Sequence, residues 1–158
     1  MTPQEFAKLI EKKAFEIMQL QKRTLPIIVG STAKVHFKQN FKEGGFVNNG
    51  VHKWKDKKVP NGYGILHSKR DHLFSSIQSV PGDGEVRIIN EVPYAEVHNT
   101  GGIQYVRPHK RTSKKGNRYN VRDHSYRMPK RQFIGESAEL NEKVQNIIET
   151  ELTKILNS

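Results

Sequence analysis

The chain has 158 residues, of which 34% are hydrophobic and 27% are charged, and its formal net charge at pH 7 is +11. This length predicts one domain, over residues 1–158, with a modest core. The charge favours polyanionic partners, and the absence of cysteine excludes disulfides, iron–sulfur clusters and thiolate nucleophiles. No stretch approaches the ~20 apolar residues that span a bilayer, and no N-terminal run resembles a signal peptide. We therefore expect cytoplasmic synthesis and no membrane partner.

The N-terminal part of the chain is predicted to form two helices. Residues 2–5 combine an N-cap threonine, a proline and a glutamate in the pattern of a helix start. Apolar residues then recur at the three- and four-residue spacing of one helical face. These residues are Phe6, Leu9, Ile10, Ala14, Ile17 and Met18. Pro26 is expected to break this helix, and a second helix is predicted from there to Phe41. The region 46–64 is rich in turn signals and is predicted to be a loop, anchored by a partly buried Trp54.

A short helix and a β-hairpin are predicted in the middle of the chain. Residues 68–71 have the form of a capping box, and the helix that follows is expected to contain Ile77. The β-branched run 85–90 and the run 94–98, which is closed by a glycine pair, together predict an antiparallel hairpin.

The C-terminal part is predicted to add two strands and a final helix. Residues 103–106 and 119–126 are the predicted strands, and Ser137 is the predicted N-cap of the helix. Between the strands the sequence indicates a flexible excursion. The resulting fold class is α+β, an antiparallel sheet built on the predicted hairpin. The N-terminal and C-terminal amphipathic helices pack against this sheet, and residues 107–128 form a long basic insertion.

The segment from Arg107 to Arg131 is a strip of ten cations that contains a single acid, Asp123. Nothing in its pattern suits burial, so we expect its central cations to contact a partner electrostatically. These residues are Arg107, Lys110, Arg111, Lys114, Lys115, Arg118 and Arg122. Tyrosines within the strip could stack on bases or pack across strands. A solvated loop whose charge only maintains solubility is the alternative.

The sequence contains no recognisable catalytic or metal-binding constellation. Its seven histidines are scattered and lack the close spacing of zinc ligands. A histidine-rich metal nuclease, faintly suggested by His98, Asn99, His109 and His124, is the weaker alternative. No pair of carboxylates, phosphate-binding loop or nucleophile elbow is visible. We therefore expect no catalytic residue, no metal and no cofactor.

Three motifs follow one another along the chain, and their order and spacing resemble a known family. The motifs are Leu73-Phe74-Ser75-Ser76-Ile77, Tyr94-Ala95-x-x-His98-Asn99-x-Gly101 and Arg131-Gln132-Phe133-Ile134-Gly135. From Phe41 to the C-terminus the chain resembles the phage virion morphogenesis family, the tail-completion proteins of Mu-like and P2-like phages and prophages. It departs from that family at Asn99, in place of glutamine, at Gln132, in place of proline, and in the long basic insertion. The motif residues to which we assign a structural role are Leu73, Ser76, Ile77, Tyr94, Ala95, His98, Gly101, Arg131, Phe133 and Gly135.

The resemblance implies a non-enzymatic assembly protein of the virion, located at the tail end or the head–tail junction and assembled in the host cytoplasm. Its implied partners are phage tail or connector proteins, with a homo-oligomeric ring and DNA as further options. Within the motifs, Tyr94 and His98 are expected to project from one strand face. Phe133 is expected to fill the core, and Arg131 to pair with a carboxylate or a helix C-terminus. The alternative function is a basic nucleic-acid-binding protein that uses the Arg107–Arg131 strip.

Overall fold

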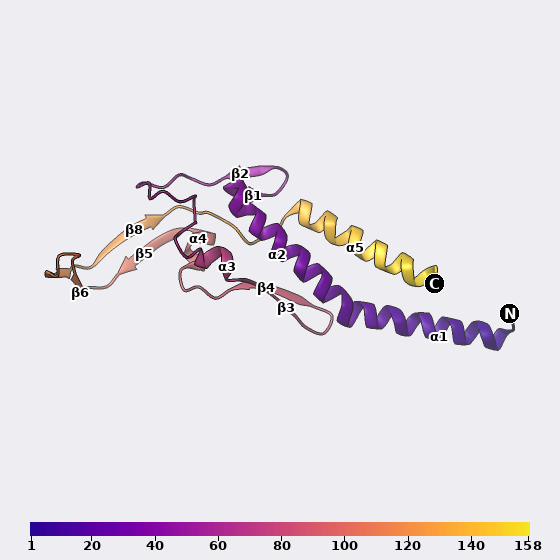
Figure 1. Cartoon of the computed structure of the whole chain (residues 1–158). Coiled ribbons are helices and arrows are strands. Elements are labelled where there is room, and N and C mark those ends of the chain that lie inside the picture. The colour runs from indigo at the N-terminus through magenta and orange to yellow at the C-terminus, as the bar shows by residue number, and fades with distance from the viewer.

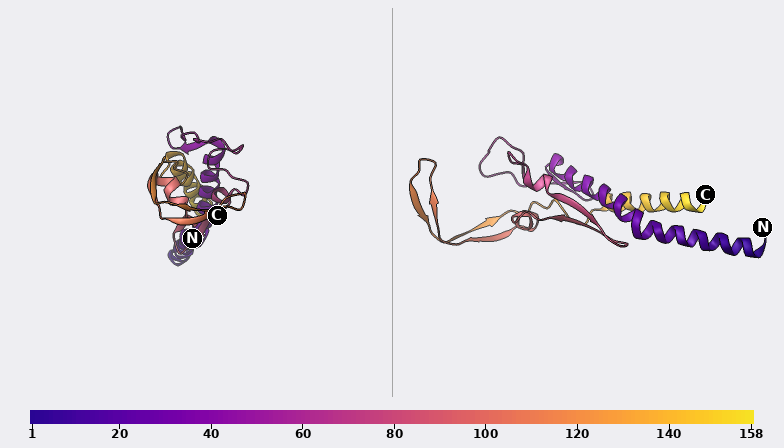
Figure 2. Two further views of the ribbon diagram at one scale, coloured as in Figure 1. Left: turned by 90° about the vertical axis from the view of Figure 1, so that its left-hand side faces the viewer. Right: turned by 60° about the horizontal axis from the view of Figure 1, so that its bottom comes forward.

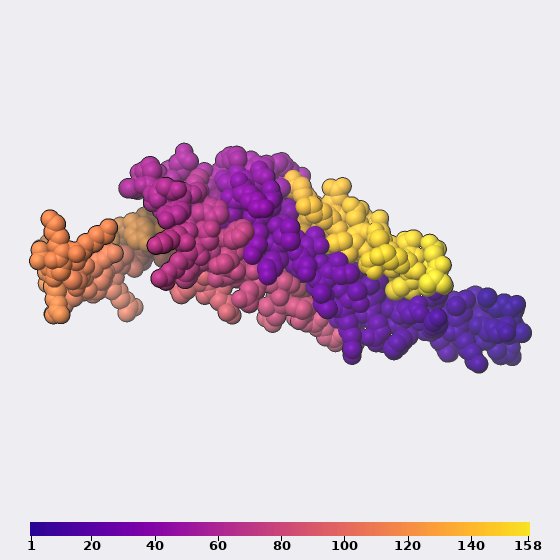
Figure 3. All heavy atoms as spheres, in the orientation of Figure 1, coloured from indigo at the N-terminus to yellow at the C-terminus, as the bar shows by residue number.

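A computed structural model describes residues 1–158 and shows an elongated molecule with a projection at each end (Figure 1 and Figure 3). A helix forms one projection, a two-stranded arm forms the other, and the core lies between them. In chain order the elements are α1 (Pro3–Gln19), η1 (Leu20–Thr24), α2 (Leu25–Glu43), β1 (Gly45–Val47), β2 (Val51–Lys53), α3 (His72–Ser75), β3 (Ile77–Pro81), β4 (Val86–Asn90), α4 (Ala95–Thr100), β5 (Gly102–Val106), β6 (His109–Thr112), β7 (Arg118–Val121), β8 (His124–Met128) and α5 (Ala138–Leu156).

The first two helices are joined by the π-helical turn η1 into one bent rod (Figure 1). The capping box at the start of α1 is confirmed, because the Thr2 hydroxyl accepts from the N–H of Glu5 at 3.2 Å and the Glu5 carboxylate accepts from the N–H of Thr2 at 2.6 Å. The expected break at Pro26 is replaced by η1. The chain is helical on both sides of Pro26, so the missing N–H removes one hydrogen bond from the rod. The carbonyl of Lys22, one turn before Pro26, accepts instead from the N–H of Gly84 at 3.1 Å, and the π-helical turn accompanies the bend.

The strands pair as four separate antiparallel hairpins or ladders: β1 with β2, β3 with β4, β5 with β8, and β6 with β7. The predicted pairing of residues 85–90 with residues 94–98 is wrong. Strand β4 pairs with the preceding β3, in the register Ile77 to Asn90, and residues 95–98 belong to helix α4. A helix is favoured there because it places Ala95 and Asn99, one turn apart, on the side that contacts the core and the C-terminal segment.

Two further predictions need correction. The helix expected to contain Ile77 ends at Ser75, because Ile77 instead starts the β3 strand that packs beside α2. The predicted loop over residues 46–64 begins with the small β1–β2 hairpin. The Trp54 prediction is confirmed, since its ring is buried and its indole N–H donates to the carbonyl of Gln132 at 2.8 Å.

The basic insertion is built as a kinked β-ribbon. Strands β5 and β8 form its stem, and β6 and β7 form its tip. Between stem and tip the pairing is interrupted at Arg107-Pro108 and at Arg122-Asp123, where proline supplies no N–H for a ladder. In the right-hand view of Figure 2 the tip turns sharply away from the direction of the stem.

The core is small: only 18 of the 158 residues are buried, so most of the chain depends on few apolar contacts. Its apolar members are Ala33, Phe37, Phe41, Phe46, Trp54, Leu73, Ile77, Ala95, Phe133 and Leu140. They come from α2, the β1–β2 region, the middle of the chain, the segment that precedes α5 and the start of α5. The predicted cap of α5 is confirmed, because the Ser137 hydroxyl accepts from the N–H of Leu140 at 3.3 Å. The α+β class is also confirmed, and none of the helices combines the length and apolar character that crossing a bilayer requires.

Candidate functional site

The kinked ribbon of residues 102–128, which we call the basic arm, carries all seven cations that the sequence singled out. Each of these side chains is exposed, and none forms an ion pair within the chain. With Asp123 as the only acid on the arm, its positive charge is uncompensated. An exposed cluster of like charges raises the local concentration of an oppositely charged surface.

The register of the tip distributes the cations over both faces of the ribbon. Arg111 lies opposite Tyr119, and Thr112 lies opposite Arg118. Cross-strand partners share a face, whereas consecutive residues such as Lys110 and Arg111 point to opposite faces. The turn that joins the two strands carries the neighbouring Lys114 and Lys115. The tip therefore presents positive charge in every direction except toward its stem.

The arm has no core of its own. No residue of β5, β6, β7 or β8 is buried, and an isolated two-stranded ribbon is marginally stable in water. The side chains of Ile103 and Tyr105 are exposed beside the cations. This combination of apolar and cationic groups on an unsupported ribbon suits a surface that becomes covered by a partner.

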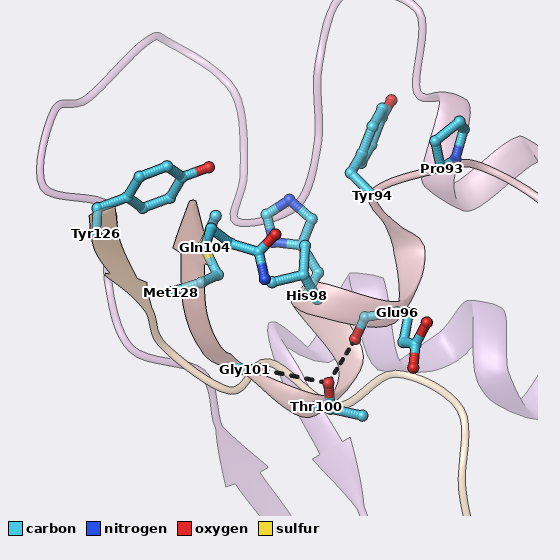
Figure 4. Close-up of a pocket in the computed structure, with 10 residues that line it drawn as sticks. Pro93, Tyr94, Glu96, His98, Thr100, Gly101, Gln104, Tyr126 and Met128 are labelled. Atoms are coloured by element: carbon cyan, nitrogen blue, oxygen red, sulfur yellow. Dashed lines mark hydrogen bonds between the residues drawn. The ribbon is translucent and has the colours of Figure 1, made fainter. Parts of the chain in front are cut away.

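A pocket of about 500 Å³ lies where the arm joins the body (Figure 4). Tyr94, the N-cap of α4, and His98 on α4 line one side, and Gln104, Tyr126 and Met128 from the stem line the other. The Tyr94 and His98 rings meet edge to face, with centroids 5.9 Å apart and planes at 87°. The expectation that both residues project from one strand face is wrong, because they are one turn apart at the start of α4.

His98 sits at the inner wall of this pocket. Its Nδ1 atom is buried and has no hydrogen-bond partner. Burial, and secondarily the nearby Arg131 cation, lower the pKa of His98 below its ordinary value of 6.5. The imidazole is therefore held neutral near pH 7. Nowhere in the chain do three histidine, aspartate or glutamate side chains gather as a metal ion would require.

Arg131 ties the C-terminal segment to the loop that follows β2. Its Nε and Nη2 atoms donate to the carbonyls of Lys55 and Asp56 at 2.8 and 2.9 Å, and its backbone N–H donates to the carbonyl of His98 at 2.8 Å. The expected partner, a carboxylate or a helix C-terminus, is therefore wrong, because loop carbonyls fill this role. Burial lowers the pKa of Arg131 below its ordinary value.

Two asparagines to which the sequence assigned no structural role hold the same segment. The Asn99 Oδ1 atom accepts from the N–H groups of Phe133 and Ile134 at 2.8 and 3.0 Å, and its Nδ2 atom donates to the Ile134 carbonyl at 3.0 Å. The fully buried Asn40 donates to the carbonyl of Phe133 at 3.0 Å. A polar residue within the apolar face of α2 was the signal that could have identified Asn40.

The three sequence motifs meet around one side chain. Leu73, Ile77 and Ala95 lie with Phe133 in the core, where Phe133 is 1% exposed. Gly101 and Gly135 lie at turns on either side of this region, and Ser76 is half-buried between α3 and β3. The motifs thus build the body that supports the arm.

Comparison with known proteins gives one informative result. The model of the phage virion morphogenesis family matches residues 47–153, a range that contains all three motifs and the whole basic arm. The comparisons with curated proteins and with solved structures return no match.

Proposed function

Because the chain belongs to the phage virion morphogenesis family, we propose that it is a virion assembly protein that completes the tail or joins it to the head, and that it acts by binding other virion proteins rather than by catalysis. The family supports a part in virion assembly. The observation that supports a docking mechanism is the basic arm, a cationic ribbon that projects from a small body and lacks ion-pair partners within its own chain.

The chemistry of the arm specifies the kind of partner. Eight cations and one acid between Gly102 and Met128 favour an acidic surface on a tail or connector protein, since complementary charge speeds encounter and fixes orientation. The exposed Tyr105 and Ile103 add apolar contact area, which the centre of a protein interface requires. The seven predicted cations are thus the proposed partner-binding residues.

Duplex DNA is the second candidate partner, because the major groove admits a two-stranded β-ribbon. The cations would then contact phosphates, and the exposed Tyr119 could reach bases. The affinity of such binding falls steeply as the salt concentration rises. On a plot of log affinity against log salt concentration, each phosphate contact makes the slope more negative by roughly 0.9. The salt dependence of the affinity therefore distinguishes an arm that binds phosphates from an arm that also relies on shape complementarity and apolar contacts with a protein.

The test is co-sedimentation of the purified chain with heads and tails from phage that lack it. The arm variant reverses three tip cations, Lys114→Glu, Lys115→Glu and Arg118→Glu. The control variant reverses three exposed cations elsewhere, Lys8→Glu, Lys69→Glu and Arg70→Glu, so both variants have the same net charge.

We expect the wild-type chain and the control variant to sediment with the particles, and the arm variant to remain in the supernatant. An arm variant that sediments as well as the wild type would contradict the proposal. Tight binding of a DNA duplex by the wild-type chain, without any binding to heads or tails, would favour the second candidate instead.

A further inference from the structure

The chain exposes far more surface than a compact protein of its mass. Its solvent-accessible surface is 11677 Å², whereas about 8,100 Å² is expected for a compact monomer of 18.2 kDa. The excess, roughly 3,500 Å², exceeds the ~800 Å² that each partner contributes to an ordinary interface. A partner for the arm therefore accounts for only part of it. Figure 3 shows that the other projection, at the opposite end, is helix α1.

Helix α1 has no buried residue, yet it carries a continuous apolar ridge. Phe6, Ile10, Ala14 and Met18 follow one another at a spacing of four, which aligns them along one of the ridges by which helices pack. Phe6 and Ile10 are 54% and 52% exposed. Because helices in proteins owe most of their stability to packing of an apolar face, the ridge is suited to being covered.

The C-terminal helix covers only the neighbouring side of α1. The Lys13 ammonium donates to the carbonyls of Ile155 and Ser158 at 2.5 and 2.7 Å, and so holds the end of α5 against the second half of α1. Leu20 is buried just beyond this contact. The first turns of α1 extend past the C-terminus (Figure 1), so α5 leaves the ridge open.

We propose that this ridge is a self-association site, at which α1 packs antiparallel against α1 of a second copy about a two-fold axis near Ile10. Phe6 and Ala14 are each four residues from Ile10. The two-fold axis therefore places the large Phe6 ring over the partner's Ala14, and the small Ala14 beneath the partner's Phe6. Alternation of large and small side chains is what allows two ridges to interlock.

The charge balance of α1 favours a second copy as the occupant. Helix α1 contains three glutamates and three lysines, and none of them lies on the ridge, so two such helices do not repel each other. Two basic arms, by contrast, would repel. Copies can therefore meet at the helical end while the arm remains available for a different surface. The inference does not depend on the proposed function. It is compatible with the ring that the family resemblance implies, because two rings joined face to face are related by such axes.

Sedimentation equilibrium of the full chain, across the micromolar range, tests this inference. We expect the wild type to form dimers, and Ile10→Glu to weaken dimerisation at least about 30-fold, because a charge would be buried at the centre of the interface. Phe15→Glu is the matched control: Phe15 is equally exposed on the same helix but lies away from the ridge. It should leave dimerisation unchanged.

Cross-linking tests the symmetry. The chain contains no cysteine, so Ile10→Cys introduces a single thiol. A short bis-maleimide should link this variant into dimers and no larger species, whereas Lys8→Cys, on the opposite side of α1, should not be linked. A wild-type chain that stays monomeric throughout the range would overturn the inference, as would equal loss of dimers in both glutamate variants. A ladder of larger cross-linked species would exclude the two-fold arrangement.

Discussion

Asn99 holds the backbone of Phe133, because its Oδ1 atom accepts the Phe133 N–H at 2.8 Å. The same side chain also bonds both backbone groups of Ile134. These bonds fix the short helix α4 to the segment that precedes α5. They explain how an asparagine works at a position where the family is expected to have glutamine. The Asn99 side chain supplies hydrogen bonds to backbone groups of Phe133 and Ile134, which lie outside any helix or strand.

Asn99→Ala should lower the free energy of unfolding by about 3 kcal/mol, because it leaves several partly buried backbone groups without a partner. Asn141→Ala, on the exposed face of α5, is the control and should change stability by less than about 0.5 kcal/mol. Urea unfolding followed by circular dichroism measures both. Equal midpoints for the two variants would show that the Asn99 contacts contribute nothing.

Gly101→Ala should destabilise the chain more than Gly116→Ala, although both glycines have positive φ, at +73° and +84°. A Cβ at Gly101 would lie 2.7 Å from the backbone nitrogen of Lys130, whereas at Gly116 it would meet nothing within 4 Å. A positive φ alone costs about 1–2 kcal/mol for alanine. At Gly101 it is combined with a ψ of −166°, a conformation essentially confined to glycine, and the backbone clash adds to the cost there. Thermal unfolding of the two variants gives the comparison, and a larger loss at Gly116 would contradict it.

Replacement of residues 109–121 by a short glycine–serine linker should leave the free energy of unfolding of the body within about 0.5 kcal/mol of the wild type. The reason is that the β6–β7 tip contributes no residue to the core. Binding to heads and tails should be lost in the same variant. A large fall in stability would mean that the arm supports the body, and its loss of binding could then not be assigned to the missing cations.

Stability should fall as the pH is lowered from 7.5 to about 5. Burial, more than the neighbouring Lys143, lowers the folded-state pKa of His36, and burial together with Arg131 does the same for His98. The unfolded chain therefore binds more protons once the pH drops below 6.5, the ordinary pKa of histidine. The stability that the two neutral histidines contribute is fully present above that pH. It is lost as the pH falls through their lowered folded-state pKa values.

His98→Gln should make stability depend less steeply on pH, since it removes one of the two histidines whose pKa is lowered. Urea midpoints at several pH values measure this dependence. The carboxyl groups with lowered pKa values, Asp71 and Glu139, have ordinary values of 3.8 and 4.5 and act at more acidic pH. A midpoint that rises or stays constant between pH 7.5 and about 5 would contradict the burial of both imidazoles in the folded state.

The long helices could be predicted from the sequence because their signals are local. Apolar spacing identified α1, and the hydroxyl of Ser137 identified the start of α5. Residues 94–98 were too few to distinguish strand alternation from a helical turn. Their helical conformation is supported by the contacts of Asn99, whose partners lie more than 30 residues away in sequence. The same applies to Ile77, which is part of a strand because β4 is available to pair with it.

The candidate site was predictable to a similar degree. Cations in a segment with few apolar residues are expected to be exposed, and the structure places all seven on the outside of the arm. The carbonyl partners of Arg131 and the asparagine contacts around Phe133 could not be predicted, because they join segments separated by 34 to 93 residues. The sequence correctly identified α1 as an amphipathic helix with one apolar face. Its exposure followed only from the position of α5.

The most direct test of the proposed function is particle assembly in a phage or prophage that lacks the gene for this chain, complemented by the wild type, the arm variant or the control variant. Infectious titre and electron microscopy of the particles are the measurements. The account predicts separate heads and tails without the gene and with the arm variant, and joined infectious particles with the wild type and the control variant. Normal infectious particles without the gene, or full rescue by the arm variant, would contradict it.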